Sequence, residues 1–263
     1  MRGGRRRLRR SAALAAVALA FAALAALAGP AAAAAGGRCP SGMRCLTVAV
    51  PLDRTGALPG TLRLPVVVER GRGPVLLALS GGPGQGGVAG ADVAARVLAR
   101  VAPGYRVAQL DQRGTGALAL RCPELQRAAL SDLTVPPPGA VEACGARLGP
   151  RRGAFATTAT VEDLEAVRRA LGVERMAIYG ISYGTYVAMR YARAFPERVS
   201  RLVLDSVVPQ ENVDPFMRAS MARAGAVLRA LCARGACRGI TRSAEADLAR
   251  LVRRAGTRPL RGS

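Results

Sequence analysis

The sequence predicts an α/β protein built on a mainly parallel sheet with helices on both faces. Two observations predict this class. The segment 74–79 is an apolar run and the segment 106–110 is largely apolar, and neither alternates regularly with polar residues, as is typical of strands buried on both faces of a sheet. Segments compatible with helices follow such strands, so that strand and helix alternate along much of the chain.

The first elements are expected to form a hairpin. Residues 46–50 and 62–69 have the composition of strands, and the segment between them, 53–60, is rich in turn residues. Residues 91–101 are compatible with a helix that connects the two apolar runs. This order places the hairpin at the start of the sheet.

The middle of the chain, 121–153, is interrupted by proline and glycine and is expected to be an excursion tied down by Cys122 and Cys144. Regular structure then resumes with a helix, for which Thr160 and Asp163 resemble a capping box and Gly172 marks the end. Three residues share the apolar face of this helix: Leu164, Val167 and Leu171.

Strand, helix and strand follow once more, and they are predicted at residues 176–179, 185–195 and 202–205. Beyond Pro209 the pattern changes, since 216–232 and 244–255 both have helical patterns and no strand follows either. The prediction is therefore a sheet domain over residues 36–208 and the start of a helical lid over 209–263.

The charge of the chain does not indicate a nucleic-acid partner. The formal net charge is +22, all 39 basic residues are arginine, and neither lysine nor histidine is present. The arginines are scattered, and aromatic residues, which would stack on bases, make up only 3% of the chain. A GC-rich coding sequence accounts for this composition, and no nucleic-acid binding is expected.

The N-terminus is predicted to be an export signal. Residues 12–28 form an apolar segment, and the alanine run at 31–35 offers sites for cleavage. An uncleaved membrane anchor is the alternative reading of the same segment. With residues 1–35 removed, the protein is expected to be secreted and to have no stable membrane association. The arginines that precede the apolar segment are Arg2, Arg5, Arg6, Arg7, Arg9 and Arg10.

Export implies an oxidising compartment, in which disulfides persist. The pairing of nearest neighbours is the preferred one among several connectivities. A metal site is disfavoured, because the chain has no histidine and no pair of cysteines two residues apart. The preferred pairs are Cys39 with Cys45, Cys122 with Cys144, and Cys232 with Cys237.

The central motif is Gly180-Ile-Ser-Tyr-Gly184, which lies between a predicted strand and a predicted helix. Such a Gly-x-Ser-x-Gly segment arises by chance, but in this setting it predicts a tight turn that exposes the Ser182 hydroxyl as a nucleophile. The glycines are needed because side chains at these positions would collide in the turn.

A second motif, Ser80-Gly-Gly-Pro-Gly84, follows the first apolar run. An oxyanion hole needs two backbone N–H groups, one from the residue after the nucleophile and one from a loop of this kind. Tyr183 is expected to supply the first, and Gly82 the second, with Gly81 as the alternative. A phosphate-binding loop is excluded, because its lysine and its glycine spacing are both missing.

A third motif, Asp111-Gln-Arg-Gly-Thr-Gly116, follows the second apolar run, and Leu202-Val-Leu-Asp-Ser-Val-Val-Pro209 closes the series. Together the motifs resemble the α/β-hydrolases of the proline iminopeptidase group, most closely the secreted tripeptidyl aminopeptidase-like branch. The resemblance implies the α/β-hydrolase fold and a serine exopeptidase that acts on peptides. Nothing in the sequence implies a cofactor or a metal. The resemblance also implies that Asp111 and Arg113 brace the loops around the nucleophile.

The chain departs from this pattern in one respect: the family's serine is activated by a histidine, and the 263 residues contain none. The chain is therefore expected to be truncated, inactive alone and poorly stable, with an unpaired apolar edge at its last strand. Asp205 could be offered as the triad acid, but the resemblance makes it a structural residue. A carboxylesterase acting on small acyl esters and a non-catalytic secreted binding protein are the alternative functions.

Overall fold

The computed structural model describes residues 39–128, 135–211 and 218–256. These residues form two units: one contains the sheet and its helices up to Gln210, and the other contains the helices from Glu211 onward. The predicted export signal, 1–35, lies outside the described residues.

The first unit is built on a six-stranded sheet with the order β1-β2-β4-β3-β5-β6. The strands β4, β3, β5 and β6 are parallel, and only β1 and β2 run antiparallel to their neighbours. The prediction of a mainly parallel sheet that opens with a hairpin is confirmed. The strands are β1 (Met43–Pro51), β2 (Thr61–Glu69), β3 (Val75–Leu79), β4 (Arg106–Leu110), β5 (Met176–Ile181) and β6 (Val199–Asp205).

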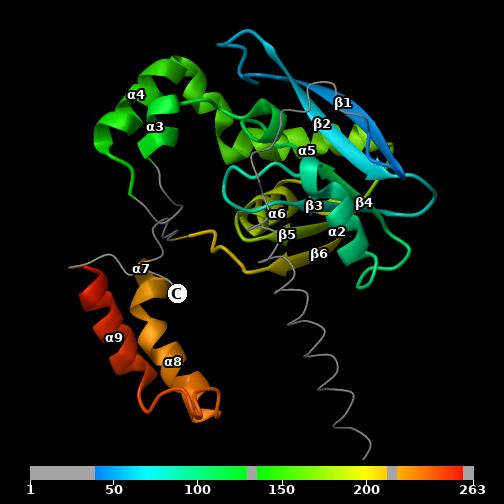
Figure 1. Cartoon of the computed structure of the whole chain (residues 1–263). Helices are drawn as coiled ribbons and strands as arrows, with labels where there is room; N and C mark the ends of the chain where they lie inside the picture. The colour runs from blue at the N-terminus through cyan, green and yellow to red at the C-terminus, as the bar shows by residue number, and fades with distance from the viewer. Residues whose placement is uncertain (1–38, 129–134, 212–217, 257–263) are drawn as a thin grey trace, which may run out of the picture. The chain divides into compact units, whose positions relative to one another are not determined.

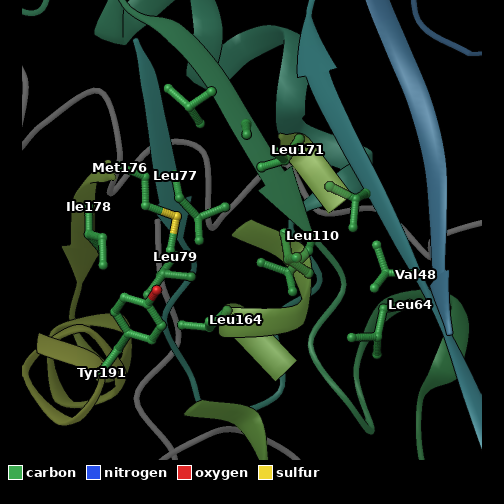
Figure 2. Close-up of a cluster of buried hydrophobic side chains, with 14 of the residues drawn as sticks. Val48, Leu64, Leu77, Leu79, Leu110, Leu164, Leu171, Met176, Ile178 and Tyr191 are labelled. Atoms are coloured by element: carbon green, nitrogen blue, oxygen red, sulfur yellow. The ribbon is translucent and has the colours of Figure 1, made fainter. Parts of the chain in front are cut away.

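Helices cover both faces of this sheet (Figure 1). In β3 all five residues are buried, and alternate side chains enter opposite layers. Leu76 and Ala78 pack with α2 (Ala91–Leu98), whereas Leu77 and Leu79 pack with α5 (Thr157–Leu171) and α6 (Tyr183–Ala194). Figure 2 shows this second layer, with Leu164 and Tyr191 facing the strands. The absence of polar residues from β3 follows from this double burial.

The strand β6 forms one edge of the sheet and is poorly covered. Leu202 is 37% exposed and Val203 is 50% exposed. Among the described residues, only β5 pairs with it. The expected apolar edge is thus present.

The middle segment holds more regular structure than the sequence predicted. It forms α3 (Pro123–Ala128) and α4 (Pro138–Leu148), which the disulfide between Cys122 and Cys144 holds together. Proline at the first turn of a helix is tolerated because the N–H that it lacks has no partner there. Pro123 and Pro138 both occupy this position, so they begin helices that they were expected to interrupt.

The predicted capping box is wrong. The helix α5 begins at Thr157, three residues before Thr160, and Ala156 is its N-cap. Thr160 is buried inside the helix, and Asp163 pairs with distant arginines. The predicted end is confirmed, because Gly172 adopts the left-handed conformation with φ 71°.

The second unit consists of α7 (Arg218–Ala222), α8 (Ala224–Ala233) and α9 (Ala244–Ala255). The helix predicted at 216–232 is divided near Arg223, and residues 216 and 217 lie outside the described residues. The helix at 244–255 agrees with its prediction, and the Ser243 hydroxyl caps it by accepting from the Ala246 amide.

All three preferred cysteine pairs are disulfides in the structure. Within the described residues, no helix has the length and apolar character needed to cross a bilayer. The short 3-10 helices are η1 (Val88–Gly90), η2 (Gly116–Leu118), η3 (Gly149–Phe155) and η4 (Pro196–Arg198).

Candidate active site

Ser182 lies between β5 and α6 in a backbone conformation that non-glycine residues rarely adopt, with φ 54° and ψ −123°. Such a conformation persists only when surrounding contacts enforce it. The Ser182 amide donates to the Asp205 carbonyl at 2.9 Å. The Ser182 carbonyl accepts from the Thr185 amide at 2.9 Å and from the Thr185 hydroxyl at 2.6 Å. Both sides of the serine are therefore fixed by hydrogen bonds.

The two glycines of the motif are required by close backbone approaches. A Cβ atom at Gly180 would lie 2.5 Å from the Gly184 carbonyl oxygen, and one at Gly184 would lie 2.3 Å from the Leu79 carbonyl oxygen. The first turn of α6 thus crosses directly over the end of β3. The collision predicted from the sequence is present at both positions.

The glycine loop lies against Ser182. A Cβ atom at Gly81 would be 3.1 Å from the serine Cβ and 3.5 Å from its Oγ. This closeness follows from the sheet order, since β3 and β5 are neighbours, with Leu79 beside Gly180. Loops at the carboxyl ends of adjacent parallel strands meet at one edge of the sheet, where ligands bind in α/β proteins.

The residues predicted for the oxyanion hole occupy different positions relative to Ser182. Tyr183 is the first residue of α6, directly after the serine. Gly82 is exposed and has φ 108°, and a Cβ atom there would meet the Gly84 amide nitrogen of its own loop at 2.7 Å. The residue placed against the serine side chain is Gly81.

Asp111 joins the start of η1, which follows the glycine loop, to the loop after β4. Its Oδ1 accepts from the Val88 amide at 3.1 Å, and its Oδ2 accepts from the Ala117 amide at 2.9 Å. Gly86 and Gly116 leave room for the carboxylate, because a Cβ atom at either would lie within 2.7 Å of it. The loop-bracing expected of Asp111 is thus supplied by two main-chain hydrogen bonds.

Arg113 braces a second set of segments. Its guanidinium is fully buried, with 0% of the side chain exposed, and forms a two-point ion pair with Asp163 of α5. It also donates to the Leu52 and Ala154 carbonyls. The loop after β4, the end of β1 and the start of α5 are therefore held at one charged centre.

Asp205 ends β6 beside the serine turn. Its Oδ2 accepts from the Tyr179 hydroxyl at 2.8 Å, and its Oδ1 accepts from the Ser206 hydroxyl at 3.0 Å. Burial, together with this bond, raises the pKa of Tyr179 above its ordinary value. These contacts agree with the structural role expected of Asp205.

Two threonines beside the serine turn went unrecognised in the sequence. Thr185 is fully buried, and its hydroxyl also accepts from the Val208 amide at 2.9 Å, so it links the turn to the chain after β6. Thr157 lies within 2.8 Å of the Tyr183 hydroxyl. Thr185 directly follows the glycine motif, and this position could have identified it. Thr157 lies 26 residues before Tyr183, and no motif in the sequence marks it.

Metal-ligating groups do not gather in the part of the chain that the structure describes, where no cluster of three His, Cys, Asp or Glu side chains occurs. All six cysteines are in disulfides. What the site offers chemically is a serine hydroxyl on a turn of rare backbone conformation, with Gly81 beside its side chain.

Sequence comparison places this arrangement among known proteins. Residues 74–234 match the alpha/beta hydrolase fold family. The chain is 32% identical over 199 residues to the tripeptidyl aminopeptidase of Streptomyces coelicolor, an alignment that covers 66% of this chain and 37% of that protein. It is 29% identical over 198 residues to the serine protease Hip1 of Mycobacterium tuberculosis, covering 67% and 38%. The chain thus spans well under half of the length of these relatives.

A shorter sequence similarity and a structural similarity are also found. The probable proline iminopeptidase of Streptomyces coelicolor is 31% identical over 110 residues, which cover 42% of this chain and 27% of that protein. Among solved structures, an epoxide hydrolase-like protein from Pseudomonas aeruginosa is 25% identical with a TM-score of 0.41, covering 72% of this chain and 49% of that one.

Proposed function

Because this chain belongs to the alpha/beta hydrolase fold family, we propose that it carries the nucleophile and the oxyanion hole of a serine hydrolase, with Ser182 as the nucleophile. One observation carries the proposal: Ser182 holds a strained conformation between two obligatory glycines while its side chain lies against Gly81. A strained serine between two such glycines, on a turn from strand to helix, is characteristic of the nucleophile in this fold.

In the proposed reaction the Ser182 Oγ attacks the carbonyl carbon of the substrate and gives its proton to a general base. The carbonyl oxygen becomes an oxyanion, which accepts hydrogen bonds from the Tyr183 amide and from an amide of the glycine loop, that of Gly82 or, as the alternative, of Gly81. The positive end of the α6 dipole also favours this charge. Collapse of the intermediate expels the amine, which takes the proton from the base, and water then releases the acyl group from Ser182.

The general base of this reaction is a histidine in the family, and none is present in the 263 residues. The base and the carboxylate that orients it would therefore come from outside this stretch of sequence. On this proposal the chain alone is inactive or nearly so, because loss of the base removes most of the rate.

The proposed substrates are peptides, from which short N-terminal segments or single residues are removed. The names of the relatives support this choice, since they include a tripeptidyl aminopeptidase and a proline iminopeptidase. A carboxylesterase would use the same residues. Comparing the hydrolysis of tripeptidyl p-nitroanilides with that of p-nitrophenyl acyl esters distinguishes the two, and faster anilide hydrolysis is expected.

We also propose that the protein is exported by the segment at residues 1–35. Three disulfides suit an oxidising compartment. Residues 36–208 would then be the first part of the catalytic domain, and residues 209–263 the start of its helical lid.

The test uses the protein translated from the complete reading frame that encodes this chain, treated with a fluorophosphonate. Covalent modification of Ser182, located by peptide mass spectrometry, is the expected result, and Ser182→Ala should not be modified. A folded wild-type protein that remains unmodified would contradict the serine mechanism and favour the alternative of a non-catalytic binding protein.

A further inference from the structure

The amide expected to stabilise the oxyanion belongs to Tyr183, and the side chain of the same residue is anchored at its far end. The Tyr183 hydroxyl lies 2.8 Å from the Thr157 Oγ1. Both side chains are half-buried, and the tyrosine packs against the apolar layer formed by α5 and α6. Each residue is the first of its helix, so this bond joins the beginning of α6 to the beginning of α5.

Thr157 is itself held in place by neighbouring contacts. Arg113 donates to the Ala154 carbonyl, three residues earlier, and pairs with Asp163 in the second turn of α5. The side chains of this ion pair are 0% and 1% exposed. These contacts lie on either side of Thr157 and fix the start of α5 to the loop after β4. The Thr157 hydroxyl is therefore a well-positioned hydrogen-bond partner for Tyr183.

The direction of the Tyr183 N–H depends on two soft torsions, ψ of Ser182 and φ of Tyr183, because the peptide bond between them is planar. The Thr185 hydrogen bonds hold the carbonyl side of this peptide. An anchored phenol restricts the rotation of the Tyr183 side chain and backbone on the amide side. Since Ser182 occupies a rare conformation, the peptide needs restraint from both sides.

We propose that Thr157 is a positioning residue for the oxyanion hole, acting through the Tyr183 hydroxyl to aim the Tyr183 amide. The proposal rests on the proposed function of Ser182. An oxyanion exists only in the transition state and intermediate, so a poorly aimed donor lowers kcat and leaves KM nearly unchanged. Removing an oxyanion donor costs about 10²–10³ in kcat. If the donor remains but is less well aimed, kcat should fall by about tenfold.

The test measures kcat and KM for a tripeptidyl p-nitroanilide with the protein from the complete reading frame. Thr157→Val and Tyr183→Phe should each lower kcat about tenfold with KM within about twofold. The double variant should be no slower than either single variant, since both remove the same bond. Thr157→Ser, which keeps the hydroxyl, should restore the wild-type kcat.

Tyr186→Phe is the matched control. Tyr186 lies one turn further along α6 and stacks on Tyr183, with ring centroids 6.1 Å apart. Its hydroxyl accepts from Arg190 at 2.7 Å. This variant loses a phenol hydroxyl from the same helix without touching Thr157, and it should keep the wild-type kcat.

The thermal midpoint of each variant shows whether it is folded at the assay temperature. A rise in KM at constant kcat, losses that multiply in the double variant, or a Thr157→Ser variant as slow as Thr157→Val would overturn the positioning role. If the wild-type protein neither hydrolyses the anilide nor reacts with fluorophosphonate, the proposed function fails and the positioning role fails with it. Wild-type activity with unaffected variants refutes the positioning role alone.

Discussion

Arg113 and Asp163, 50 residues apart in sequence, form a two-point ion pair in the protein interior, with the Nε–Oδ2 and Nη2–Oδ1 distances both 2.7 Å. Each charge has been removed from water, so each depends on the other and on its remaining hydrogen bonds. Asp163 also pairs with Arg54, whose side chain is 32% exposed.

Asp163→Asn should therefore lower the free energy of unfolding by about 3 kcal/mol, because it leaves the buried Arg113 guanidinium without its counter-charge. Urea denaturation followed by circular dichroism measures the change. Asp92→Asn is the control: Asp92 pairs with Arg96 on the surface, and its removal should cost about 0.5 kcal/mol or less. Equal losses of stability in the two variants would contradict the larger contribution assigned to the buried Arg113–Asp163 pair.

Gly184→Ala should destabilise the protein by about 3 kcal/mol or more, since the added methyl would overlap backbone atoms of β3 that cannot move aside. The measurement is the urea midpoint of the purified variant. Gly145→Ala in α4 has open space for its Cβ atom and serves as the control. It should stabilise the protein by about 0.5–1 kcal/mol through helix propensity. A stable Gly184→Ala variant would contradict the close crossing of α6 over β3.

Thr185→Val should lower the free energy of unfolding by about 1–3 kcal/mol, because it removes one hydrogen bond to the Ser182 carbonyl and leaves the Val208 amide without its acceptor. Thr185→Ser retains the hydroxyl and loses one buried methyl, so its loss should be about 1 kcal/mol. The two variants are compared by urea denaturation. A Thr185→Val variant as stable as the wild-type protein would contradict the role assigned to the hydroxyl.

Glu165 gives the stability a specific pH dependence. Hydrogen bonds from Arg168, and then from Tyr191, lower the pKa of this carboxyl group from 4.5 to about 2. Because the pKa is lower in the folded state, the stabilisation is complete above pH 4.5 and is lost progressively as the pH falls from about 4.5 to about 2.

Glu165→Gln should accordingly destabilise the protein at pH 7, and the difference from wild type should shrink as the pH approaches 2. Unfolding free energies measured at a series of pH values test this. Glu162→Gln, an exposed position on the same helix, should change the free energy by less than about 0.5 kcal/mol at pH 7. A difference between wild type and Glu165→Gln that stays constant down to pH 2 would contradict the assigned pKa.

The sheet could be predicted from the sequence because the burial of its strands determines which residues occur at neighbouring positions. The strand β3 is apolar at every position because both of its faces are covered. Gly172 marks the end of α5 because glycine readily adopts the left-handed backbone conformation found there. Gly180 can be predicted for a similar reason, because the chain there approaches itself at Gly184, four residues further on. Gly184 is required by a close approach to Leu79, which is far away in sequence.

The contacts that brace the site could not be predicted, because they join residues far apart in sequence. Asp163 has the spacing of a capping residue, yet its partner is Arg113 from another loop. The pairing of Thr157 with Tyr183 likewise depends on how α5 lies beside α6, which no local pattern encodes. Pro138 lies in a segment that the sequence predicts to be interrupted by proline, yet it begins α4.

Because Gly81 lies against Ser182, the surface beside the serine hydroxyl consists of main chain at this position. Any larger residue at position 81 would press on the serine, as a Cβ atom there already lies 3.1 Å from the serine Cβ. Few substitutions at position 81 are therefore compatible with the observed position of Ser182. Descendants of this sequence that acquire new preferences are expected to change segments farther from the hydroxyl and to inherit the glycine unaltered.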